Sequence, residues 1–255
     1  MAEFTQTDIT DGIATLSLAR PEALNSVTMA LADGVVAALA DLDRDAAVKA
    51  IILTGQGRAF CAGVDLAEGS QQTPETVPGW FSKVAATYKA ILEVEKPVIA
   101  AINGVAAGAG FQMALCSDMR IAAEGARLGQ PEINAGLPSI MGTYWMSLHL
   151  PRAVNQDLSL TGRMMEMDEA HRHGLVQHVV PPDDLLAKAT EQADLMAGKS
   201  AIAFRATKAR FRREALAGFD AALDEAVTTQ RMAFQAGEPQ RIMGEFLAKR
   251  ATKRG

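Results

Sequence analysis

The stretch NGVAAGAGFQM, residues 103–113, is dominated by glycine and alanine and follows the short apolar run PVIAAI at 97–102. A continuous apolar run of this length predicts a strand that is buried on both faces, as in a parallel sheet. Small residues after such a strand indicate either very close packing or a ligand that approaches the backbone itself. For this tract alone, close packing of a helix on a strand is the simpler interpretation.

A second tract of the same kind shifts the interpretation toward function. FCAGVD, residues 60–65, lies shortly after the apolar run AIILTG at 50–55. If the two strands are neighbours, both bends emerge at one edge of the sheet, where backbone N–H groups can converge on a single ligand oxygen. A helix that begins within AGAGFQMAL, residues 107–115, would add the positive end of its dipole. The two tracts together therefore predict an oxyanion hole.

The glycines do not match a nucleotide site. GAGFQM has Met113 where a dinucleotide fingerprint has its third glycine, and GQGRAF has Phe60 there. The Gly-Lys-Ser/Thr of a P-loop is absent from the sequence. His171 and His173 are two residues apart and would point away from each other on a helix, without cysteines or paired carboxylates to complete a zinc set. We therefore expect neither a nucleotide cofactor nor a metal.

Composition narrows the class of protein. The chain has 255 residues, of which 49% are hydrophobic, and a formal net charge of −5. These values favour one large domain, or one domain with an appendage, and they disfavour nucleic-acid binding, which needs clustered Lys and Arg. No apolar run approaches the ~20 residues of a membrane span, and the polar start MAEFTQTDITDG is not a signal peptide. The two cysteines, Cys61 and Cys116, form no disulfide framework, so we expect a cytoplasmic protein.

Strands and helices are predicted to alternate in the first part of the chain, around a mainly parallel sheet with right-handed crossovers. Thr28 is expected to cap a helix that runs to about residue 43, and residues 56–69 are expected to form a loop. From residue 183 on, the amphipathic pattern predicts helices only. We therefore expect an α/β core over residues 1–182 and a helical region over 183–255. The predicted strands are 3–9, 13–19, 48–55, 97–102 and 119–124, and the predicted C-terminal helices are 183–200, 202–216 and 219–235.

Five fragments, taken in order, resemble one family. They are RPEALNSV at 20–27, GRAFCAGVDL at 57–66, KPVIAAINGVAAGAGFQMALCSDMRIA at 96–122, GQPEINAGLP at 129–138, and LTGR at 160–163 with EAHRHGLVQHVVP at 169–181. Together they resemble the enoyl-CoA hydratase/isomerase (crotonase) family from about residue 10 to residue 250. The resemblance implies a crotonase-like α/β spiral of ββα units, with C-terminal helices that assemble a homotrimer or a homohexamer. It also implies an acyl-CoA substrate, with coenzyme A as part of the substrate and no separate cofactor.

The resemblance assigns the oxyanion hole to the backbone amides of Val64 and Ala109. Many family members have glycine at the second position, and the alanine here keeps the N–H. Asp65 is counted with the substrate-binding residues, although its position before a predicted helix indicates a cap. The full substrate-binding set implied by the resemblance is Ala23, Ala62, Val64, Asp65, Leu66, Ala109 and Lys249.

Glu132, in GQPEINAG, falls on the catalytic glutamate of the family. Apolar neighbours would desolvate its carboxylate and raise its pKa toward working pH, which suits a base beside the substrate α-carbon. Gln112 stands where hydratases of the family typically have a second glutamate, and an amide cannot exchange a proton at neutral pH. We therefore expect isomerisation of an enoyl-CoA double bond, with Glu132 as the proton shuttle. Two alternatives stay open: hydration with Gln112 only orienting the water, and a catalytically weak acyl-CoA binder.

Three further residues are expected to be structural. Cys61 lies inside the first glycine tract, and with no histidine near it in sequence it is interpreted as a small buried thiol and not as a nucleophile. Tyr144 and Trp145 follow GLPSIMG, where relatives have smaller residues. Core packing is the simpler interpretation of this pair, and a reshaped acyl pocket is the alternative.

Overall fold

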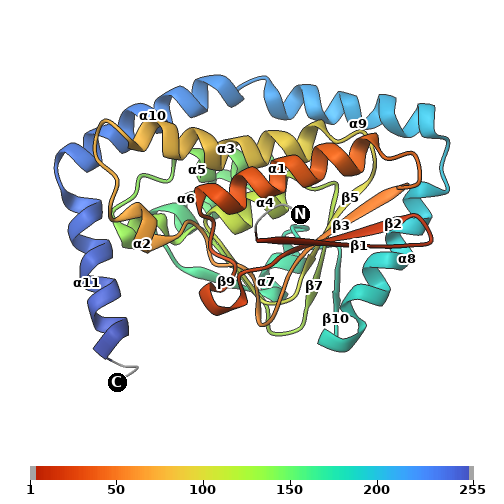
Figure 1. Cartoon of the computed structure of the whole chain (residues 1–255), viewed down its shortest axis with the longest axis horizontal. Helices are drawn as coiled ribbons and strands as arrows, with labels where there is room; N and C mark the ends of the chain where they lie inside the picture. The colour runs from red at the N-terminus through yellow and green to blue at the C-terminus, as the bar shows by residue number, and fades with distance from the viewer. Residues whose placement is uncertain (1–3, 253–255) are drawn as a thin grey trace.

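A six-stranded sheet forms the centre of the protein in the computed structural model, which describes residues 4–252 (Figure 1). Its strand order is β1-β2-β3-β5-β7-β10, and every neighbouring pair is parallel except the antiparallel β1-β2 hairpin. This arrangement confirms the predicted mainly parallel α/β core; Glu3, at which the first predicted strand begins, lies outside the described residues. The strands are β1 (Thr5–Thr10), β2 (Ile13–Leu18), β3 (Ala50–Gly55), β5 (Val98–Ile102), β7 (Met119–Ala123) and β10 (His178–Val180).

A second, four-stranded sheet is made of three-residue strands that the sequence analysis missed. Its order is β4-β6-β8-β9, and β4, β6 and β8 are parallel to one another. Each of these three follows a strand of the large sheet, so the chain winds as repeated β-β-α units, as expected for a crotonase-like spiral. The strands are β4 (Ala59–Cys61), β6 (Val105–Ala107), β8 (Arg127–Gly129) and β9 (Met164–Glu166).

The prediction that residues 56–69 form a loop throughout was wrong. The segment contains β4 and a short helix, α2 (Leu66–Gly69), on either side of the glycine bend. β4 exists because it pairs with β6, and because the buried side chain of Asn25 donates a hydrogen bond to the carbonyl of Ala59, at 2.8 Å. Both contacts join residues that are far apart in sequence, so local pattern did not indicate the strand.

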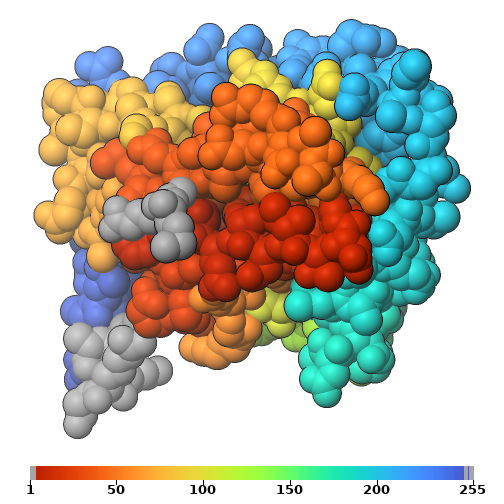
Figure 2. Space-filling model, turned by 45° about the vertical axis from the view of Figure 1, so that its right-hand side comes forward, coloured from red at the N-terminus to blue at the C-terminus, as the bar shows by residue number. Residues whose placement is uncertain are grey.

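Helices cover the large sheet on both faces, which explains why every residue of β3 and β5 is buried. α1 (Met29–Arg44) packs against α3 (Val77–Glu93) on one side, and α8 (Leu185–Ala197) packs against β3, β5 and β7 on the other. Thr28 caps α1 as predicted, since its hydroxyl accepts a hydrogen bond from the N–H of Leu31. The β1-β2 hairpin (red) lies at the surface beside α1 (orange), as Figure 2 shows.

The C-terminal part of the described chain is helical, as predicted. α10 packs on α3 and α5, and α11 packs on α2, so both helices reach back to the segments around the glycine tracts. Figure 1 shows α9 and α10 along one side of the molecule and α11 turning away from them at the end. Within residues 4–252, none of the helices has the length and apolar character needed to cross a bilayer. The remaining helices are α4 (Ala109–Cys116), α5 (Ile140–Ser147), α6 (Arg152–Thr161), α7 (Met167–Arg172), α9 (Ala201–Leu216), α10 (Phe219–Gln235) and α11 (Glu238–Thr252), with 3-10 turns η1 (Pro21–Ala23), η2 (Pro131–Ala135) and η3 (Pro182–Asp184).

Gly110 marks the place where α4 lies directly against β4, and its substitution tests that contact. A Cβ at Gly110 would lie 2.6 Å from the Cβ of Cys61 and closer still to the Cys61 carbonyl oxygen, so the backbone must move to accept it. We expect Gly110→Ala to lower the free energy of unfolding by roughly 1–3 kcal/mol, measured by urea denaturation. Gly79→Ala is the control, because nothing lies within 4 Å of a Cβ there and alanine favours the helix; it should leave stability unchanged or raise it by up to ~1 kcal/mol. Equal effects of the two substitutions would contradict the close contact.

Candidate active site

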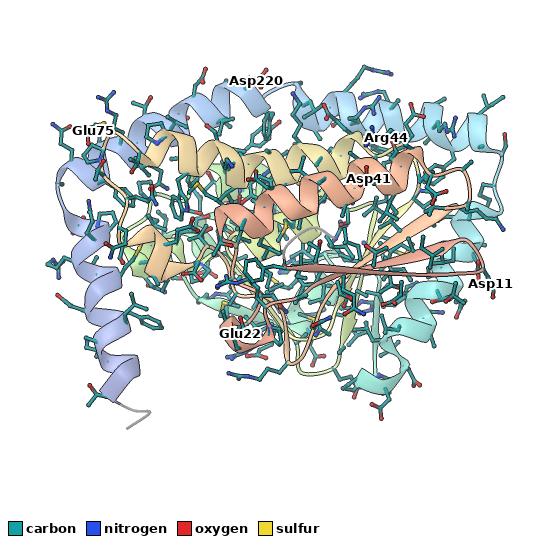
Figure 3. All side chains as sticks on the ribbon, in the orientation of Figure 1. Asp11, Glu22, Asp41, Arg44, Glu75 and Asp220 are labelled. Atoms are coloured by element: carbon teal, nitrogen blue, oxygen red, sulfur yellow. The ribbon has the colours of Figure 1, made fainter. Side chains whose placement is uncertain are left out.

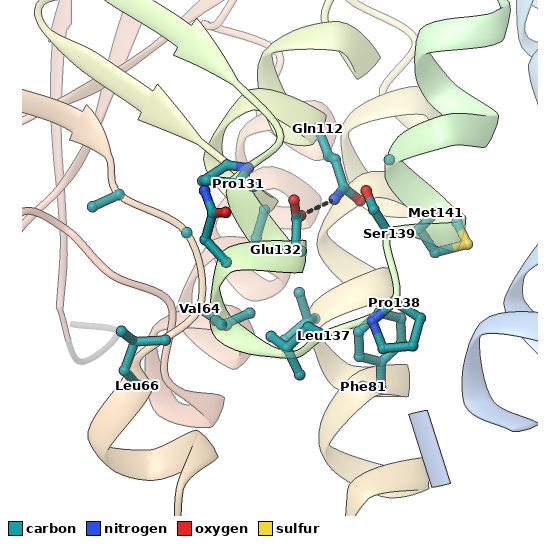
Figure 4. Close-up of a pocket in the computed structure, with 18 of the residues that line it drawn as sticks. Val64, Leu66, Phe81, Gln112, Pro131, Glu132, Leu137, Pro138, Ser139 and Met141 are labelled. Atoms are coloured by element: carbon teal, nitrogen blue, oxygen red, sulfur yellow. Dashed lines mark hydrogen bonds between the residues drawn. The ribbon is translucent and has the colours of Figure 1, made fainter. Parts of the chain in front are cut away.

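A cavity of about 360 Å³ opens beside the two glycine tracts. Its wall is built from loop 62–66, from α3, from the start of α4, from residues 131–142 and from α11. Figure 4 shows Glu132 in the middle of this wall, with Val64 on one side and Met141 on the other. The lining segments are distributed over most of the chain, so the cavity forms only once the core has assembled.

The two glycine bends touch each other at the cavity. Gly63 has φ +101° and Gly108 has φ +51°, a region of backbone conformation that side chains disfavour. A Cβ built on Gly108 would lie 3.7 Å from the Cα of Gly63 and 3.0 Å from Oε1 of Glu132. The bends after β3 and β5 therefore meet as predicted, and the carboxyl of Glu132 lies against them.

Two backbone N–H groups at these bends are free to bind a ligand. Among residues 4–252, neither the N–H of Val64 nor that of Ala109 donates a hydrogen bond, and both residues line the cavity. The loop around Val64 is fixed on both sides, because Val27 N–H donates to the Gly63 carbonyl at 2.8 Å and Asp65 N–H donates to the Val27 carbonyl at 2.9 Å. Ala109 begins α4, so its N–H belongs to the unpaired first turn, at the positive end of the helix.

Glu132 carries the only carboxyl group among the described residues that line the cavity. Its Oε1 accepts hydrogen bonds from the amide of Gln130 at 2.7 Å and from the amide of Gln112 at 3.0 Å, while its Oε2 is buried and has no partner. Burial raises the pKa of Glu132 to about 7, and hydrogen bonds from its own backbone and from Gln112 offset only part of that effect. A carboxyl group with this pKa both accepts and returns protons near neutral pH.

The arrangement combines an acid–base group with a place for negative charge. A carbonyl oxygen bound by the amides of Val64 and Ala109 would be polarised, because two N–H dipoles and the start of a helix all point positive charge at it. Glu132 lies on the same wall, against Gly108, within reach of atoms next to that carbonyl. The site is therefore suited to removing a proton beside a carbonyl group and stabilising the resulting enolate.

The other predicted binding residues divide into two groups. Ala62 and Leu66 line the cavity beside Val64. Asp65 does not line it: its carboxylate accepts hydrogen bonds from two N–H groups of α2 and pairs with Arg20 at 3.1 Å, so it is a helix cap, as its sequence position indicated. Ala23, in η1, and Lys249, exposed on α11, lie outside the cavity wall. A contact of these last two residues with coenzyme A stays a prediction.

The three residues expected to be structural lie in the core or at its edge. Cys61 is fully buried, and burial raises the pKa of its thiol to about 12, which keeps it protonated and unreactive at neutral pH. Trp145 is 1% exposed and packs edge-on against Tyr144, whose hydroxyl donates to the carbonyl of Ala215. Neither aromatic residue lines the cavity, so core packing is confirmed for the pair and the alternative of a reshaped acyl pocket was wrong.

Sequence reasoning missed Gln130, Tyr88 and the wall formed by α11. Gln130 could have been found, since it stands two residues before Glu132 in the same motif and donates the shorter hydrogen bond to it. Tyr88 gave no signal, because nothing near it in sequence distinguishes it from the core residues of α3. Ile242, Met243 and Phe246 reach the cavity only through the packing of α11 on α2. Groups of three or more metal-binding side chains are absent from the described part of the chain.

Comparison with known proteins agrees with this site. The family model for enoyl-CoA hydratase/isomerase matches residues 8–253. A protein of Mycobacterium tuberculosis named "Probable enoyl-CoA hydratase" is 38% identical over 245 residues, which cover 94% of this chain and 92% of that protein. The 1,2-epoxyphenylacetyl-CoA isomerase of Escherichia coli is 32% identical over 256 residues, with 98% of each chain covered. The crystal structure of an enoyl-CoA hydratase/isomerase from Xanthobacter autotrophicus superimposes with a TM-score of 0.88 at 26% identity, over 98% of this chain and 94% of that one.

Fold and site thus define a protein of the crotonase class, built from ββα units with a buried carboxyl group beside two glycine bends. The match to the family model and to relatives over nearly the whole chain makes the assignment definite. The chain belongs to the enoyl-CoA hydratase/isomerase family.

The raised pKa of Glu132 has a measurable effect on stability. Because its pKa is about 7 in the folded protein and near 4.5 when exposed, the folded state binds the proton more tightly, and this contribution is lost as pH rises from 4.5 through 7. We expect the free energy of unfolding of the wild type, relative to that of Glu132→Gln, to fall by roughly 3 kcal/mol over this interval and then to level off. Urea denaturation of both proteins from pH 4.5 to 8.5 measures the difference. Parallel pH profiles would show that the carboxyl has an ordinary pKa.

Proposed function

We propose that this protein acts on an acyl-CoA thioester through a stabilised enolate. The thioester oxygen binds the amides of Val64 and Ala109, and Glu132 exchanges the proton at the neighbouring carbon. The observation that carries the proposal is the contact of the buried Glu132 carboxyl with the bend at Gly108, beside two unpaired N–H groups. Family membership supports coenzyme A as the carrier of the acyl group.

Isomerisation of an enoyl-CoA is the favoured reaction, because Gln112 replaces a second acid. Glu132 removes a proton from C2 of a 3-enoyl-CoA, the electrons of that C–H bond form a dienolate, and Glu132 returns the proton to C4 as the double bond moves to C2–C3. One carboxyl group is sufficient for this exchange. Gln112 contributes a hydrogen bond to Oε1 of Glu132 and leaves Oε2 free to carry the proton.

Hydration is the second candidate, and one contact favours it. The carbonyl oxygen of Gln112 is buried next to Glu132 and has no partner, so a water molecule admitted beside Glu132 would supply the missing hydrogen bond. Relatives named as hydratases support this alternative as well. In that case Glu132 alone activates the water and the amide only orients it.

The proposal also includes the oligomeric state of the protein and its location in the cell. Large apolar side chains are exposed on the C-terminal helices, including Ile202 at 83%, Phe211 at 68% and Phe246 at 52%, and such side chains support a homotrimer or homohexamer assembled through residues 183–255. Two buried free cysteines fit a reducing, cytoplasmic environment. The proposed reaction needs no cofactor besides the coenzyme A of the substrate.

Glu132→Gln tests the role of the carboxyl group. The amide keeps the shape and hydrogen-bonding ability of the side chain but cannot exchange protons, so turnover should fall by about 10²- to 10⁴-fold while acyl-CoA affinity stays nearly unchanged. Turnover is followed with 2-enoyl- and 3-enoyl-CoA in heavy water by mass spectrometry, which distinguishes addition of water from movement of the double bond. If the variant retains most of its activity, the base lies elsewhere; if the wild type binds these esters but converts none, the protein is an acyl-CoA binder.

Gln112→Glu tests whether a second carboxyl group in the site shifts the reaction from isomerisation toward hydration. A second acid beside Glu132 would supply the proton that water addition needs, so the ratio of hydration to isomerisation should rise. Gln112→Leu is the control, since it removes the amide without adding an acid and should not raise that ratio. A wild type that already hydrates faster than it isomerises, and loses hydration in Gln112→Leu, would establish the second candidate in place of the first.

A further inference from the structure

Tyr88 brings a hydroxyl group to the cavity that the proposed reaction does not use. The residue lies on α3, is 2% exposed and lines the cavity. Its hydroxyl makes no hydrogen bond with any of the described residues, yet its oxygen is not among the buried polar atoms that are sealed from solvent. Because the residue lines the cavity and otherwise packs in the hydrophobic core, the hydroxyl is placed at the cavity. The ring packs edge-on against Trp145, with centroids 6.2 Å apart, which fixes its direction.

Two more polar atoms in the same wall lack partners. Oε1 of Gln112 and Oγ of Ser139 are buried and make no hydrogen bond within the described residues. In Figure 4 both side chains lie on the side of Glu132 toward Met141. Buried polar groups are nearly always paired in folded proteins, because an unmade hydrogen bond is costly. Both oxygens are covered, however, so of these three groups the hydroxyl of Tyr88 is the one that a ligand in the cavity can reach.

The rest of this wall is apolar and carries no positive charge. Phe81 and Val84 of α3 line the cavity together with Met141, and no Lys, Arg or His is found among its described lining residues. An acyl group with its own carboxylate would meet no cation there and would be repelled by Glu132. The group on the substrate that the Tyr88 hydroxyl binds is therefore uncharged.

We propose that the acyl group of the substrate carries an uncharged oxygen substituent, a hydroxyl or a ketone, beyond the reacting carbons, and that Tyr88 donates a hydrogen bond to it. The inference rests on the proposed function, because it takes the cavity to be the acyl site. It makes Tyr88 a residue that determines substrate specificity, with no part in the proton transfer.

Binding measurements with unreactive saturated thioesters test the inference. Isothermal titration calorimetry of the full chain compares hexanoyl-CoA with 5-oxohexanoyl-CoA and with 6-hydroxyhexanoyl-CoA, and pentanoyl-CoA with 4-oxopentanoyl-CoA. At least one oxygenated ester should bind the wild type about 3- to 10-fold more tightly than its plain counterpart, the range expected for one net hydrogen bond. Tyr88→Phe should lower that ratio to about one and leave the affinity for the plain ester nearly unchanged, because the ring and its packing stay.

Tyr144→Phe is the matched control. It also removes one hydroxyl from an aromatic residue next to Trp145, but Tyr144 does not line the cavity, so the ratio should stay at its wild-type value. Should Tyr88→Phe fail to fold, the wild-type comparison still decides, because a wild type that binds plain and oxygenated esters equally contradicts the inference.

Three outcomes would overturn the inference. A wild type that prefers none of the oxygenated esters shows that the Tyr88 hydroxyl binds only water. A ratio that is unchanged in Tyr88→Phe removes the assignment of the hydrogen bond to Tyr88. Failure of the wild type to bind any acyl-CoA, plain or oxygenated, rejects the proposed function as well, whereas binding of plain esters without a preference leaves it intact.

Discussion

Contact between two stretches of bare backbone is the constraint on which the site depends. A Cβ on Gly63 would crowd the carbonyl oxygen of Ala107 at 3.1 Å, and a Cβ on Gly108 would crowd Oε1 of Glu132 at 3.0 Å. Gly110 allows α4 to lie directly against Cys61. The two bends follow β4 and β6, which are parallel neighbours, so they reach this contact from the same edge of the second sheet. The contact brings Val64 and Ala109 to one cavity, where neither N–H has a partner among the described residues. Because these glycines have no side chains, a ligand can approach the backbone atoms at the bends.

Burial of Glu132 raises its pKa, so its carboxyl group can exchange protons near neutral pH. A carboxyl group in water would be fully ionised at neutral pH and a weak base, whereas the buried group has a pKa of about 7. Gln130 and Gln112 both donate to the same oxygen, so they orient the carboxyl and leave Oε2 available. The position of Gln112 then limits the chemistry, because an amide positions a partner but supplies no proton.

The helical part of the cavity wall is proposed to select the acyl group. α3 and α5 supply apolar side chains, and α11 closes the space by packing on α2. Tyr88 interrupts this apolar surface with a hydroxyl group that has no partner among the described residues. In the proposal, reaction and selectivity are carried by different elements: the bends and η2 hold the groups proposed to react, and α3 holds the residue proposed to discriminate among substrates.

The sequence by itself determined the buried strands, the bends that follow them and the residue proposed as the acid–base group. Continuous apolar runs predicted β3, β5 and β7, and the ordered motifs placed Glu132 and Gln112 in the site. Only the tertiary structure decided the three-residue strands of the second sheet, because pairing with distant strands and not local propensity stabilises them. It also decided the contributions of Tyr88 and α11, and the raised pKa of Glu132. Burial and unpaired hydrogen-bonding groups depend on which distant segments come together, and a linear pattern does not contain that information.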